Sequence, residues 1–511
     1  MAIPVIDLFA GPGGLGEGFS SLTRGDGARA FKIRLSVEKD EHAHRTLELR
    51  AFFREFSPGE APADYYEYLT RRITRQELFE RHRDAAAKAE GEAWLAELGG
   101  KKTLDHEVDE RIRGALGNRR NWVLIGGPPC QAYSIVGRSR VIGAVGGRAR
   151  YEADPRHELY RHYLRILAVH RPPVFVMENV KGLLSAKLKE EHIFDRILAD
   201  LANPAAAMPE SATEGVEYQL FPLAVRNDEP TDLYEPEDFV VCAEKHGIPQ
   251  ARHRIIILGI RSDVAGEPGV LEAADTVTVR QAIADLPRLR SGLSKEADSL
   301  TAWREAVLAL EHTSWMRNGA LDDELRTALG AALTRVAAGL DRGSEFVPSV
   351  ELPGCHLGWF FDARLGGACN HETRGHIRED LHRYFFASVF ARKYGRPPLL
   401  EDFPSALLPK HGNVAAALKE TKFNDRFRVQ MAGRPSTTIV SHISKDGHYF
   451  IHYDPAQCRS LTVREAARLQ TFPDNYRFEG PRTEQYKQVG NAVPPLLARQ
   501  VAQIVADLMA G

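Results

Sequence analysis

The stretch Val5-Ile-Asp-Leu-Phe-Ala-Gly-Pro-Gly-Gly-Leu-Gly-Glu-Gly-Phe19 decides the fold class, because a short apolar run passes into a glycine-rich turn and then into a helix-like segment. Glycine lets the backbone approach a ligand closely and adopt positive φ. Gly11, Gly13 and Gly16 fit the pattern G-x-G-x-x-G, which by itself is weak evidence for a nucleotide-like ligand. Glu38 ends the next apolar run, about twenty residues later, where an acidic residue can accept the hydroxyls of a ribose. Together these features favour a cofactor that contains adenosine.

Further apolar runs alternate with longer helix-like segments, which predicts an α/β fold with a doubly wound parallel sheet. Polar or glycine-rich residues follow most of these runs, and in open α/β sheets ligands bind at the carboxyl ends of the strands. The charged, Ala- and Glu-rich segment 50–120 predicts a helical insertion. The expected strands are Val5–Phe9, Ile33–Val37, Trp122–Ile125, Val174–Met177 and Ile255–Ile260.

The composition is that of an ordinary globular protein, with 43% hydrophobic and 27% charged residues in 511. No apolar run approaches the ~20 residues that span a bilayer, and the N-terminus lacks the basic region of a signal peptide. Five cysteines without a CxxC pair point to a reducing compartment, so a cytoplasmic location is expected. The net charge of -2 means that any surface for nucleic acid must be a local patch.

A strand-ending motif, Gly126-Gly-Pro-Pro-Cys-Gln-Ala-Tyr-Ser134, carries the sharpest chemical signal. Prolines stiffen the chain, so the thiol of Cys130 is expected to be held rigidly at the edge of the sheet. Glu178 ends another expected strand, where its carboxyl group could hydrogen-bond a substrate ring. A buried glutamate without a partner is costly, so Glu178 has either a structural partner or a ligand.

Two arginines and a glutamine alternate in Gln250-Ala-Arg252-His-Arg254, directly before an expected strand. In an extended segment these three side chains lie on one face. Two guanidinium groups there would lower the pKa of a nearby thiol and bind phosphate or an anionic intermediate. An edge strand with a solvated basic face is the alternative interpretation.

The pattern of apolar and polar residues changes after the last expected strand, Ile255–Ile260. Residues 302–340 predict amphipathic helices, and residues 354–453 show little clear period. The segment 361–450 contains more Lys and Arg than Asp and Glu, which favours a surface that faces nucleic acid. A zinc site is not predicted, because the candidate ligands have irregular spacing and no paired cysteines. Those candidates are Cys355, His356, Cys369, His371 and His376.

The ordered set of motifs resembles the DNA (cytosine-5-)-methyltransferase family. The motifs are FAGPGG at 9–14, VE at 37–38, GGPPCQAYS at 126–134, MENV at 177–180, QARHR at 250–254, CRSLTVREAARLQTFPDNY at 458–476 and QVGNAVPP at 488–495. They span Asp7 to Pro495 in the order of the family. The resemblance implies a Rossmann-like domain that uses S-adenosyl-L-methionine and releases S-adenosyl-L-homocysteine. It also implies that the C-terminal helix returns to the N-terminal sheet.

The resemblance further implies roles for individual residues. Cys130 would add to carbon 6 of cytosine, Glu178 would contact ring nitrogen 3, and Arg252 and Arg254 would stabilise developing charge. The cofactor would contact Phe9, Gly11, Gly13, Gly14, Leu15, Glu38, Pro129, Leu159, Asn491 and Val493. The target cytosine would be flipped out of the duplex, and DNA would contact Gln131, Ser134, Arg138, Gln250, Arg426 and Arg428. The arginine- and glycine-rich loop Val136–Tyr151 suits either a mobile lid or an ordinary surface loop.

The expected organisation is a catalytic domain at 1–285, a target-recognition domain at 286–458, and C-terminal motifs at 459–511 that return to the catalytic domain. We expect a monomer that acts on double-stranded DNA and not on membranes, as part of a restriction-modification or related phage-defence system, with or without a partner nuclease. Two alternatives remain. One is a tRNA cytosine-5 methyltransferase, which the long segment after Arg254 disfavours, and the other is a catalytically silent DNA-binding homologue, which the intact Cys130 disfavours.

Overall fold

The structure is a computed structural model, and it describes residues 1–100, 102–128, 159–188, 191–210, 215–226, 234–317, 321–336, 339–409 and 424–510. The chain divides into two compact units. The first comprises Met1–Tyr65, Arg75–Asp275 and Ala492–Gly511, and the second comprises Tyr66–Thr74 and Thr276–Asn491. Residues 459–491 group with the second unit, whereas the predicted domain limits join them to the catalytic domain. The functional labels of these domains stay predictions.

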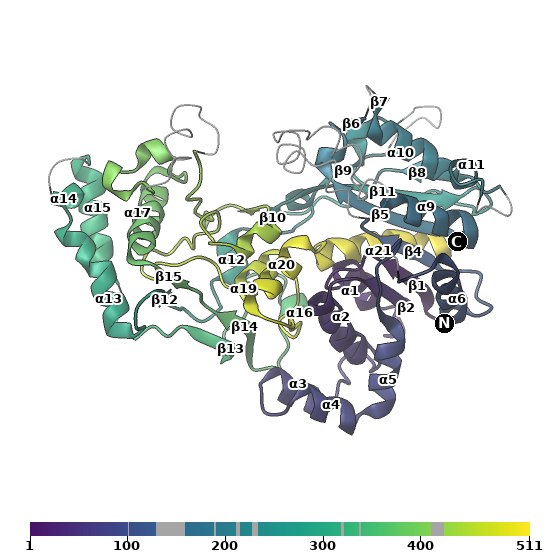
Figure 1. Ribbon diagram of the computed structural model, residues 1–511, viewed down its shortest axis with the longest axis horizontal. Coiled ribbons are helices and arrows are strands. Elements are labelled where there is room, and N and C mark those ends of the chain that lie inside the picture. The colour runs from purple at the N-terminus through teal and green to yellow at the C-terminus, as the bar shows by residue number, and fades with distance from the viewer. Residues whose placement is uncertain are drawn as a thin grey trace. The chain divides into compact units, whose positions relative to one another are not determined.

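A sheet of eight strands forms the centre of the first unit in the described part of the chain (Figure 1). The strand order is β3-β2-β1-β4-β5-β11-β8, and β9 pairs with the other end of β11. The strands are β1 (Ile3–Leu8), β2 (Phe31–Glu38), β3 (Ala93–Leu95), β4 (Val123–Gly126), β5 (Val174–Val180), β8 (Tyr218–Phe221), β9 (Val240–Cys242) and β11 (His253–Arg261).

The expected α/β class is confirmed, with a correction to the direction of the strands. The five strands from β3 to β5 in the sheet order run parallel to their neighbours. Strand β11 instead runs antiparallel to β5, β8 and β9, so the prediction of a parallel sheet is wrong at this edge. All five predicted strands are present. In β4, β5 and β11 buried apolar residues follow one another, as in sheets that are covered on both sides, whereas polar residues alternate with apolar ones in β2.

The predicted helical insertion at 50–120 contains a strand that the sequence did not reveal. Helices α4 (Arg75–Arg81), α5 (Arg83–Glu92) and α6 (Asp105–Leu116) lie within it, together with the end of α2 (Glu41–Arg54) and with α3 (Ala63–Leu69). Strand β3, only three residues long, pairs with β2 at the edge of the sheet. Such a short strand has too few residues to show an alternating pattern, so its neighbours in space decide its structure.

Helices α6, α9 (Leu159–His170) and α10 (Ile193–Ala202) pack on the sheet through a continuous apolar core. This core combines strand residues such as Leu8 and Leu124 with helix residues such as Ile112 and Leu167. Helices α1 (Gly14–Ser21) and α21 (Pro495–Ala510) pack against each other. A Cβ atom at Gly18 would lie 2.4 Å from the Cβ of Ala498, so the close contact between these helices requires glycine.

The second unit has its own core around a helix that the sequence analysis did not predict. Helix α17 (Arg378–Tyr394) lies in the segment 354–453, where the sequence shows little clear period. Its residues Leu381, Tyr384, Phe385 and Phe386 are fully buried. A helix that is buried on most sides lacks the amphipathic period by which helices are recognised, which explains the omission.

The amphipathic helices expected at 302–340 are present and pack against α17. They are α13 (Leu300–Leu308), α14 (Ser314–Arg317) and α15 (Asp323–Leu333). The unit also contains the paired strands β13 (Gly343–Pro348) and β14 (Gly367–Glu372), and helices α12 (Val279–Ile283), α16 (Leu357–Phe360), α19 (Val463–Leu469) and α20 (Arg482–Asn491).

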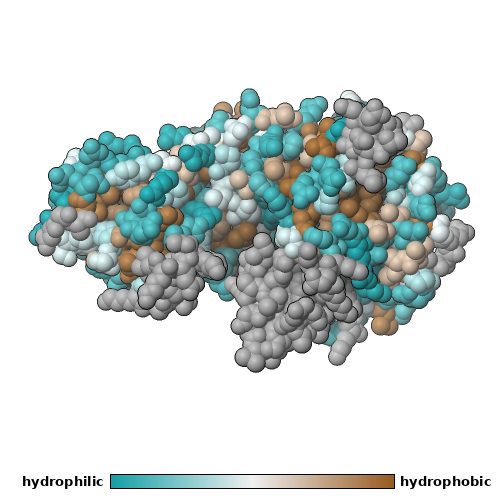
Figure 2. All heavy atoms as spheres, turned by 90° about the horizontal axis from the view of Figure 1, so that it is seen from above, coloured by the Kyte–Doolittle hydropathy of each residue, from teal (hydrophilic) through white to brown (hydrophobic). Residues whose placement is uncertain are grey.

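Hydrophilic residues cover much of the face drawn in Figure 2, with apolar residues between them, as is usual for globular proteins. Among the described residues, no helix has both the length and the apolar character needed to cross a membrane.

Candidate active site

The glycine-rich turn connects the central strand β1 to helix α1 at the carboxyl edge of the sheet. Phe9, Gly11 and Gly13 have φ values of 55°, 57° and 96°. The turn is closed by a hydrogen bond of 2.9 Å from the Gly13 amide to the Ala10 carbonyl oxygen. This conformation leads the chain from the strand into the first turn of a helix, whose free N–H groups favour a polar or anionic ligand.

Glu38, at the end of β2, faces this turn. Its Oε2 accepts a hydrogen bond of 2.8 Å from the Gly11 amide, and its Oε1 accepts bonds of 2.9 and 2.8 Å from the amides of Lys39 and Asp40. Burial raises the pKa of Glu38, and the three backbone amides act in the opposite direction. The carboxylate is thus oriented before any ligand binds, and Oε2 accepts one bond among the residues that the structure describes, which leaves room for a second donor.

The segment before α21 returns to the same turn. A Cβ atom at Gly14 would lie 2.2 Å from the carbonyl oxygen of Val493, so the two backbones touch. Gly14 and Val493 were both predicted to line the cofactor site, and they lie in the same unit. Asn491, the last residue of α20, is exposed and belongs to the second unit. Leu15, the second residue of α1, is buried.

Asp7 is a buried acidic residue whose importance the sequence analysis missed. Its side chain lies beneath the glycine-rich turn, where a Cβ atom at Gly16 would approach Asp7 Oδ2 to 2.9 Å. Burial raises the pKa of Asp7 to about 8, and the Arg54 guanidinium acts in the opposite direction. The carboxyl group is therefore mostly protonated at neutral pH. The available signal was an acidic residue inside the apolar run of β1.

Strands β5 and β11 bring Glu178 and Arg254 together. In the antiparallel register Glu178 lies opposite Ile256, and Arg254 lies opposite Val180. The Nε atom of Arg254 lies 3.0 Å from Oε1 of Glu178, and both side chains are largely buried. This ion pair gives Glu178 the structural partner that a buried carboxylate requires.

The end of β4 lies against the end of β5. A Cβ atom at Gly127 would lie 3.2 Å from Oε2 of Glu178, which leaves only a glycine-sized space. Asn179 is buried, and its Nδ2 donates a hydrogen bond of 3.2 Å to the Pro128 carbonyl oxygen. The chain that leads towards Cys130 is therefore fixed beside the Glu178 carboxylate as far as Pro128.

Arg252 and Gln250 are buried in the segment that precedes β11. Burial lowers the pKa of Arg252 well below its usual range, and the positive charge of Arg254 lowers it further. Two buried guanidinium groups repel each other, and an anion between or beside them would relieve this repulsion. The prediction that both arginines serve one site is consistent with this arrangement.

Several predicted site residues lie outside the described part of the chain, namely Pro129, Cys130, Gln131, Ser134 and Arg138, together with the loop Val136–Tyr151. Leu159, the first residue of α9, is half-buried.

Two of the three arginines predicted to contact DNA, Arg426 and Arg428, lie in the second unit, and Arg428 has internal partners. Arg428 forms an ion pair with Asp425, and its guanidinium lies 5.7 Å from the centre of the Tyr449 ring. Arg426 is half-buried. Arg428 is thus held in place by Asp425 and Tyr449, and the sequence alone did not show these contacts.

Three of the five residues considered above as zinc ligands have hydrogen-bond partners within the chain. Cys369 donates to the Leu69 carbonyl oxygen, both ring nitrogens of His371 are hydrogen-bonded, to Thr462 and Pro287, and Nε2 of His376 lies 3.2 Å from the Ser460 hydroxyl. These contacts use the atoms that a metal ion would need.

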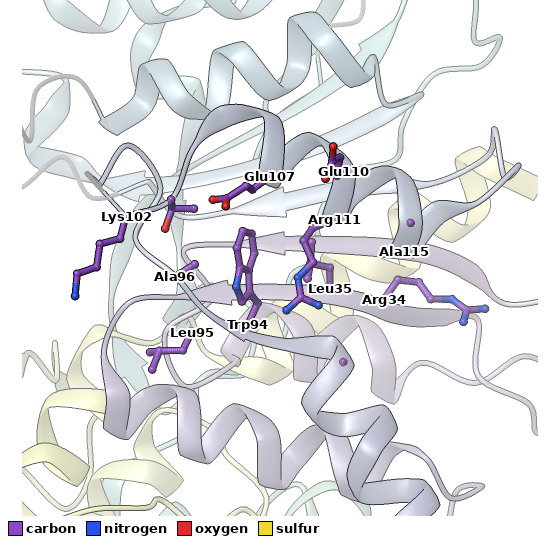
Figure 3. A pocket seen from close by; sticks show the side chains of 13 residues that line it. Arg34, Leu35, Trp94, Leu95, Ala96, Lys102, Glu107, Glu110, Arg111 and Ala115 are labelled. Carbon is purple, nitrogen blue, oxygen red and sulfur yellow. The ribbon is translucent and has the colours of Figure 1, made fainter.

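A separate pocket of about 810 Å³ lies beside β2, β3 and α6 (Figure 3). The Arg111 guanidinium lies 5.0 Å from the Trp94 ring in its wall. None of the residues that line it belongs to the predicted site, so this pocket is not the predicted cofactor site.

Comparison with known proteins identifies the family. The family model for C-5 cytosine-specific DNA methylases matches residues 105–204 and 358–506. The type II methyltransferase M.Bpa9945I of Bacillus paralicheniformis is 33% identical, with 99% of each chain covered. M.AgeI of Thalassovita gelatinovora is 26% identical, with 98% of each chain covered. The DNA (cytosine-5-)-methyltransferase M.ApeKI of Aeropyrum pernix is 28% identical over 76% of this chain and 81% of its own.

A crystal structure supports the fold assignment. A candidate DNA modification methyltransferase encoded within an E. coli prophage is 19% identical, covers all of both chains and has a TM-score of 0.51. The similarity in sequence to M.Bpa9945I extends over 99% of the chain. The chain therefore belongs to the C-5 cytosine-specific DNA methylase family.

Proposed function

We propose that this chain transfers a methyl group from S-adenosylmethionine to carbon 5 of a flipped-out cytosine, in a specific sequence of double-stranded DNA, through a covalent bond between Cys130 and carbon 6. Membership of the family makes it a DNA (cytosine-5-)-methyltransferase, and enzymes of this family act on DNA and use S-adenosylmethionine. The contact of Gly127 with Glu178 is the observation that carries the catalytic part of the proposal, because it puts the start of the cysteine-bearing loop beside an acid.

The glycine-rich turn fits S-adenosylmethionine. The positive φ values at Gly11 and Gly13 give the ligand access to the backbone, and Glu38 is held in place to accept a ribose hydroxyl. Both oxygens of Glu38 already accept backbone bonds, and a ribose hydroxyl could share Oε2 with the Gly11 amide. Further contacts are proposed for Phe9, Gly14, Leu15, Pro129, Leu159, Asn491 and Val493.

The nucleophile is proposed to be the thiolate of Cys130. Carbon 5 of cytosine is a weak nucleophile, and addition of the thiolate to carbon 6 turns the ring into an enamine that can attack an electrophile. The bound cofactor supplies the electrophilic methyl group. Loss of the carbon 5 proton and of the thiolate then restores the aromatic ring.

Glu178, Arg252 and Arg254 are proposed to stabilise the negative charge that develops on the cytosine ring when the thiolate adds to carbon 6. Glu178 can hydrogen-bond or protonate ring nitrogen 3, so that the ring electrons displaced by addition of the thiolate are not left as a free anion. Arg254 holds the Glu178 carboxylate through its Nε atom, and Arg252 adds positive charge for the base or its phosphate.

The DNA partner requires contacts beyond the reacting base. We propose that Gln131, Ser134, Arg138 and Gln250 contact the DNA near the flipped base, and that Arg426 and Arg428 belong to a target-recognition domain in the second unit. The enzyme would act as a monomer in the cytoplasm, where host DNA lies, and would protect that DNA from a partner nuclease or a related defence system.

Expression in a host that lacks cytosine methylation tests the function. Genomic DNA is sequenced for 5-methylcytosine after expression of the wild type, Cys130→Ala and the control Cys355→Ala. We expect methylation at one short motif with the wild type and the control, and none with Cys130→Ala. Methylation with Cys130→Ala would refute the covalent mechanism. If folded wild type leaves DNA unmethylated, the same assay on tRNA distinguishes an RNA enzyme from a silent binder.

A further inference from the structure

Three side chains of different chemistry meet on strands β9 and β11 of the first unit, beside the segment that carries Gln250, Arg252 and Arg254. They are Cys242 at the end of β9, Glu244 in the turn that follows, and His253 at the start of β11. One potential ligand atom from each lies within 4.8 Å of the other two. In the described part of the chain no other group of three such residues meets this criterion.

Backbone pairing fixes this cluster. Cys242 lies directly opposite His253 in the antiparallel ladder of β9 and β11, and the Ala243 amide donates a hydrogen bond of 3.1 Å to the Arg252 carbonyl oxygen. Residues directly opposite each other in such a ladder have their side chains on the same face, with Cβ atoms about 5 Å apart. The approach of the thiol and the imidazole is therefore a property of the strand register.

Glu244 completes the cluster and has an unused oxygen. Its Oε1 lies 2.7 Å from Nε2 of His253, whereas its Oε2 is buried and has no hydrogen-bond partner among the described residues. A buried carboxylate oxygen without a partner carries a desolvation cost that a cation would offset.

We propose that Cys242, Glu244 and His253 form a binding site for a zinc-type divalent cation. Thiolate and imidazole are ligands that zinc prefers over magnesium or calcium, and a carboxylate oxygen is its third common ligand. Ligand distances of about 2.0–2.3 Å in a tetrahedron place ligand atoms roughly 3.3–3.8 Å apart, so small side-chain movements bring the three atoms into range. Water fills the fourth position.

Binding requires a defined movement of protons. The Cys242 thiol loses its proton to solvent, and the imidazole coordinates through Nε2 while its proton resides on Nδ1. Burial raises the pKa of the Cys242 thiol, Glu244 raises it further, and Lys245 and Lys181 act in the opposite direction. A bound cation would offset the first two effects and favour the thiolate.

The site would act on the catalytic arginines through the backbone. His253 lies between Arg252 and Arg254 in sequence, and alternation along an extended strand directs it to the opposite face. A cation bound by both Cys242 and His253 would cross-link the end of β9 to the start of β11. It would thereby constrain the connecting loop Ala243–Arg252, which contains Gln250. The proposed site therefore stabilises the segment that presents Gln250 and Arg252 without occupying the reaction site.

Cobalt binding tests the proposal directly. The untagged full-length chain is stripped with a chelator and titrated with Co²⁺, which gives a thiolate-to-cobalt charge-transfer band when a cysteine coordinates it. Zn²⁺ affinity is then measured by competition with a colorimetric chelator. We expect one Co²⁺ per chain with this band, displacement by Zn²⁺, and a thermal midpoint that rises when Zn²⁺ is added.

Variants assign the ligands. In Cys242→Ser the band is lost, and in Glu244→Gln and His253→Gln the Zn²⁺ affinity falls by about tenfold or more, whereas Cys355→Ser behaves as the wild type. Absence of the band in the wild type, or an unchanged band in Cys242→Ser, overturns the proposal. Circular dichroism confirms that each variant is folded, and Glu244→Gln serves as the second test if Cys242→Ser does not fold. None of these readouts depends on methyl transfer.

Discussion

Asn179 donates a hydrogen bond from its buried side-chain amide to the carbonyl oxygen of Pro128, over a distance of 3.2 Å. The same amide accepts a bond of 2.8 Å at its Oδ1 from the backbone N–H of Val180. One side chain therefore connects the end of β5, which carries Glu178, to the residue that lies two positions before Cys130. This relationship links the two groups that the proposed reaction needs close together.

Asn179→Ala should lower kcat while cofactor binding stays unchanged. Loss of one buried hydrogen bond costs about 1 kcal/mol, which is roughly fivefold in rate if the bond positions the loop during reaction. Steady-state kinetics and cofactor titration measure the two effects. Asn118→Ala, an exposed site, is the control. An unchanged kcat in a folded Asn179→Ala variant would show that the bond has no positioning role.

Gly18→Ala should destabilise the packing of α1 on α21. The added methyl group would lie 2.4 Å from the Cβ of Ala498 and 2.6 Å from backbone atoms, which cannot move independently of the helix. Overpacking of this kind costs about 1–3 kcal/mol. The free energy of unfolding of Gly18→Ala is measured in urea. The control is Gly25→Ala, where an added Cβ meets nothing within 4 Å. Equal stability of the two variants would contradict the close contact.

Asp7→Asn should change the pH dependence of stability. The pKa of Asp7 is raised from 3.8 to about 8 in the folded chain, so the unfolded chain releases this proton at lower pH than the folded chain does. Asp7 therefore makes the wild type less stable as the pH rises from about 4 to about 8. The thermal midpoint of Asp7→Asn, relative to the wild type, should increase over this range. A constant difference, as expected for the exposed control Asp275→Asn, would argue against a buried neutral Asp7.

Arg426→Ala should weaken DNA binding and reduce its dependence on salt. For a side chain that contacts a phosphate, the slope of log K against log salt concentration falls by about 1 in magnitude. Fluorescence anisotropy at several salt concentrations measures this slope, with Arg304→Ala on the exposed face of α13 as the control. A slope equal to that of the wild type would remove Arg426 from the proposed DNA surface.

Local sequence patterns predicted the elements that local interactions determine. The run from Val5 to Phe19 predicted a strand, a turn and a helix, because apolar residues, glycines and helix formers follow one another directly. The position of Glu38 was predictable for the same reason. Strand β3 was not predictable, because three residues acquire their structure only from pairing with β2. Helix α17 was missed because burial on most sides removes its amphipathic pattern.

Contacts between distant parts of the chain could not be derived from the sequence. The motifs around Cys130, Glu178 and Arg254 suggested one site, but the pairing of Arg254 with Glu178 depends on the antiparallel register of β11, which was predicted as parallel. The contact of Asn179 with Pro128 likewise depends on the packing of β5 beside β4. The neutral state of Asp7 depends on burial beneath the glycine-rich turn.

The most direct test of the central claim is to trap Cys130 on its substrate. The substrate is a duplex that contains the motif recognised by the enzyme, with 5-fluorocytosine in place of the target cytosine. Fluorine at carbon 5 cannot leave as a proton after methyl transfer. We predict that the wild type and Cys355→Ser form a covalent complex with this duplex, stable to denaturation, only when S-adenosylmethionine is present, with the bond mapped to Cys130 by mass spectrometry. Cys130→Ser should form none. A complex of equal yield with Cys130→Ser, or methylation by the wild type without any covalent complex, would contradict the proposed mechanism.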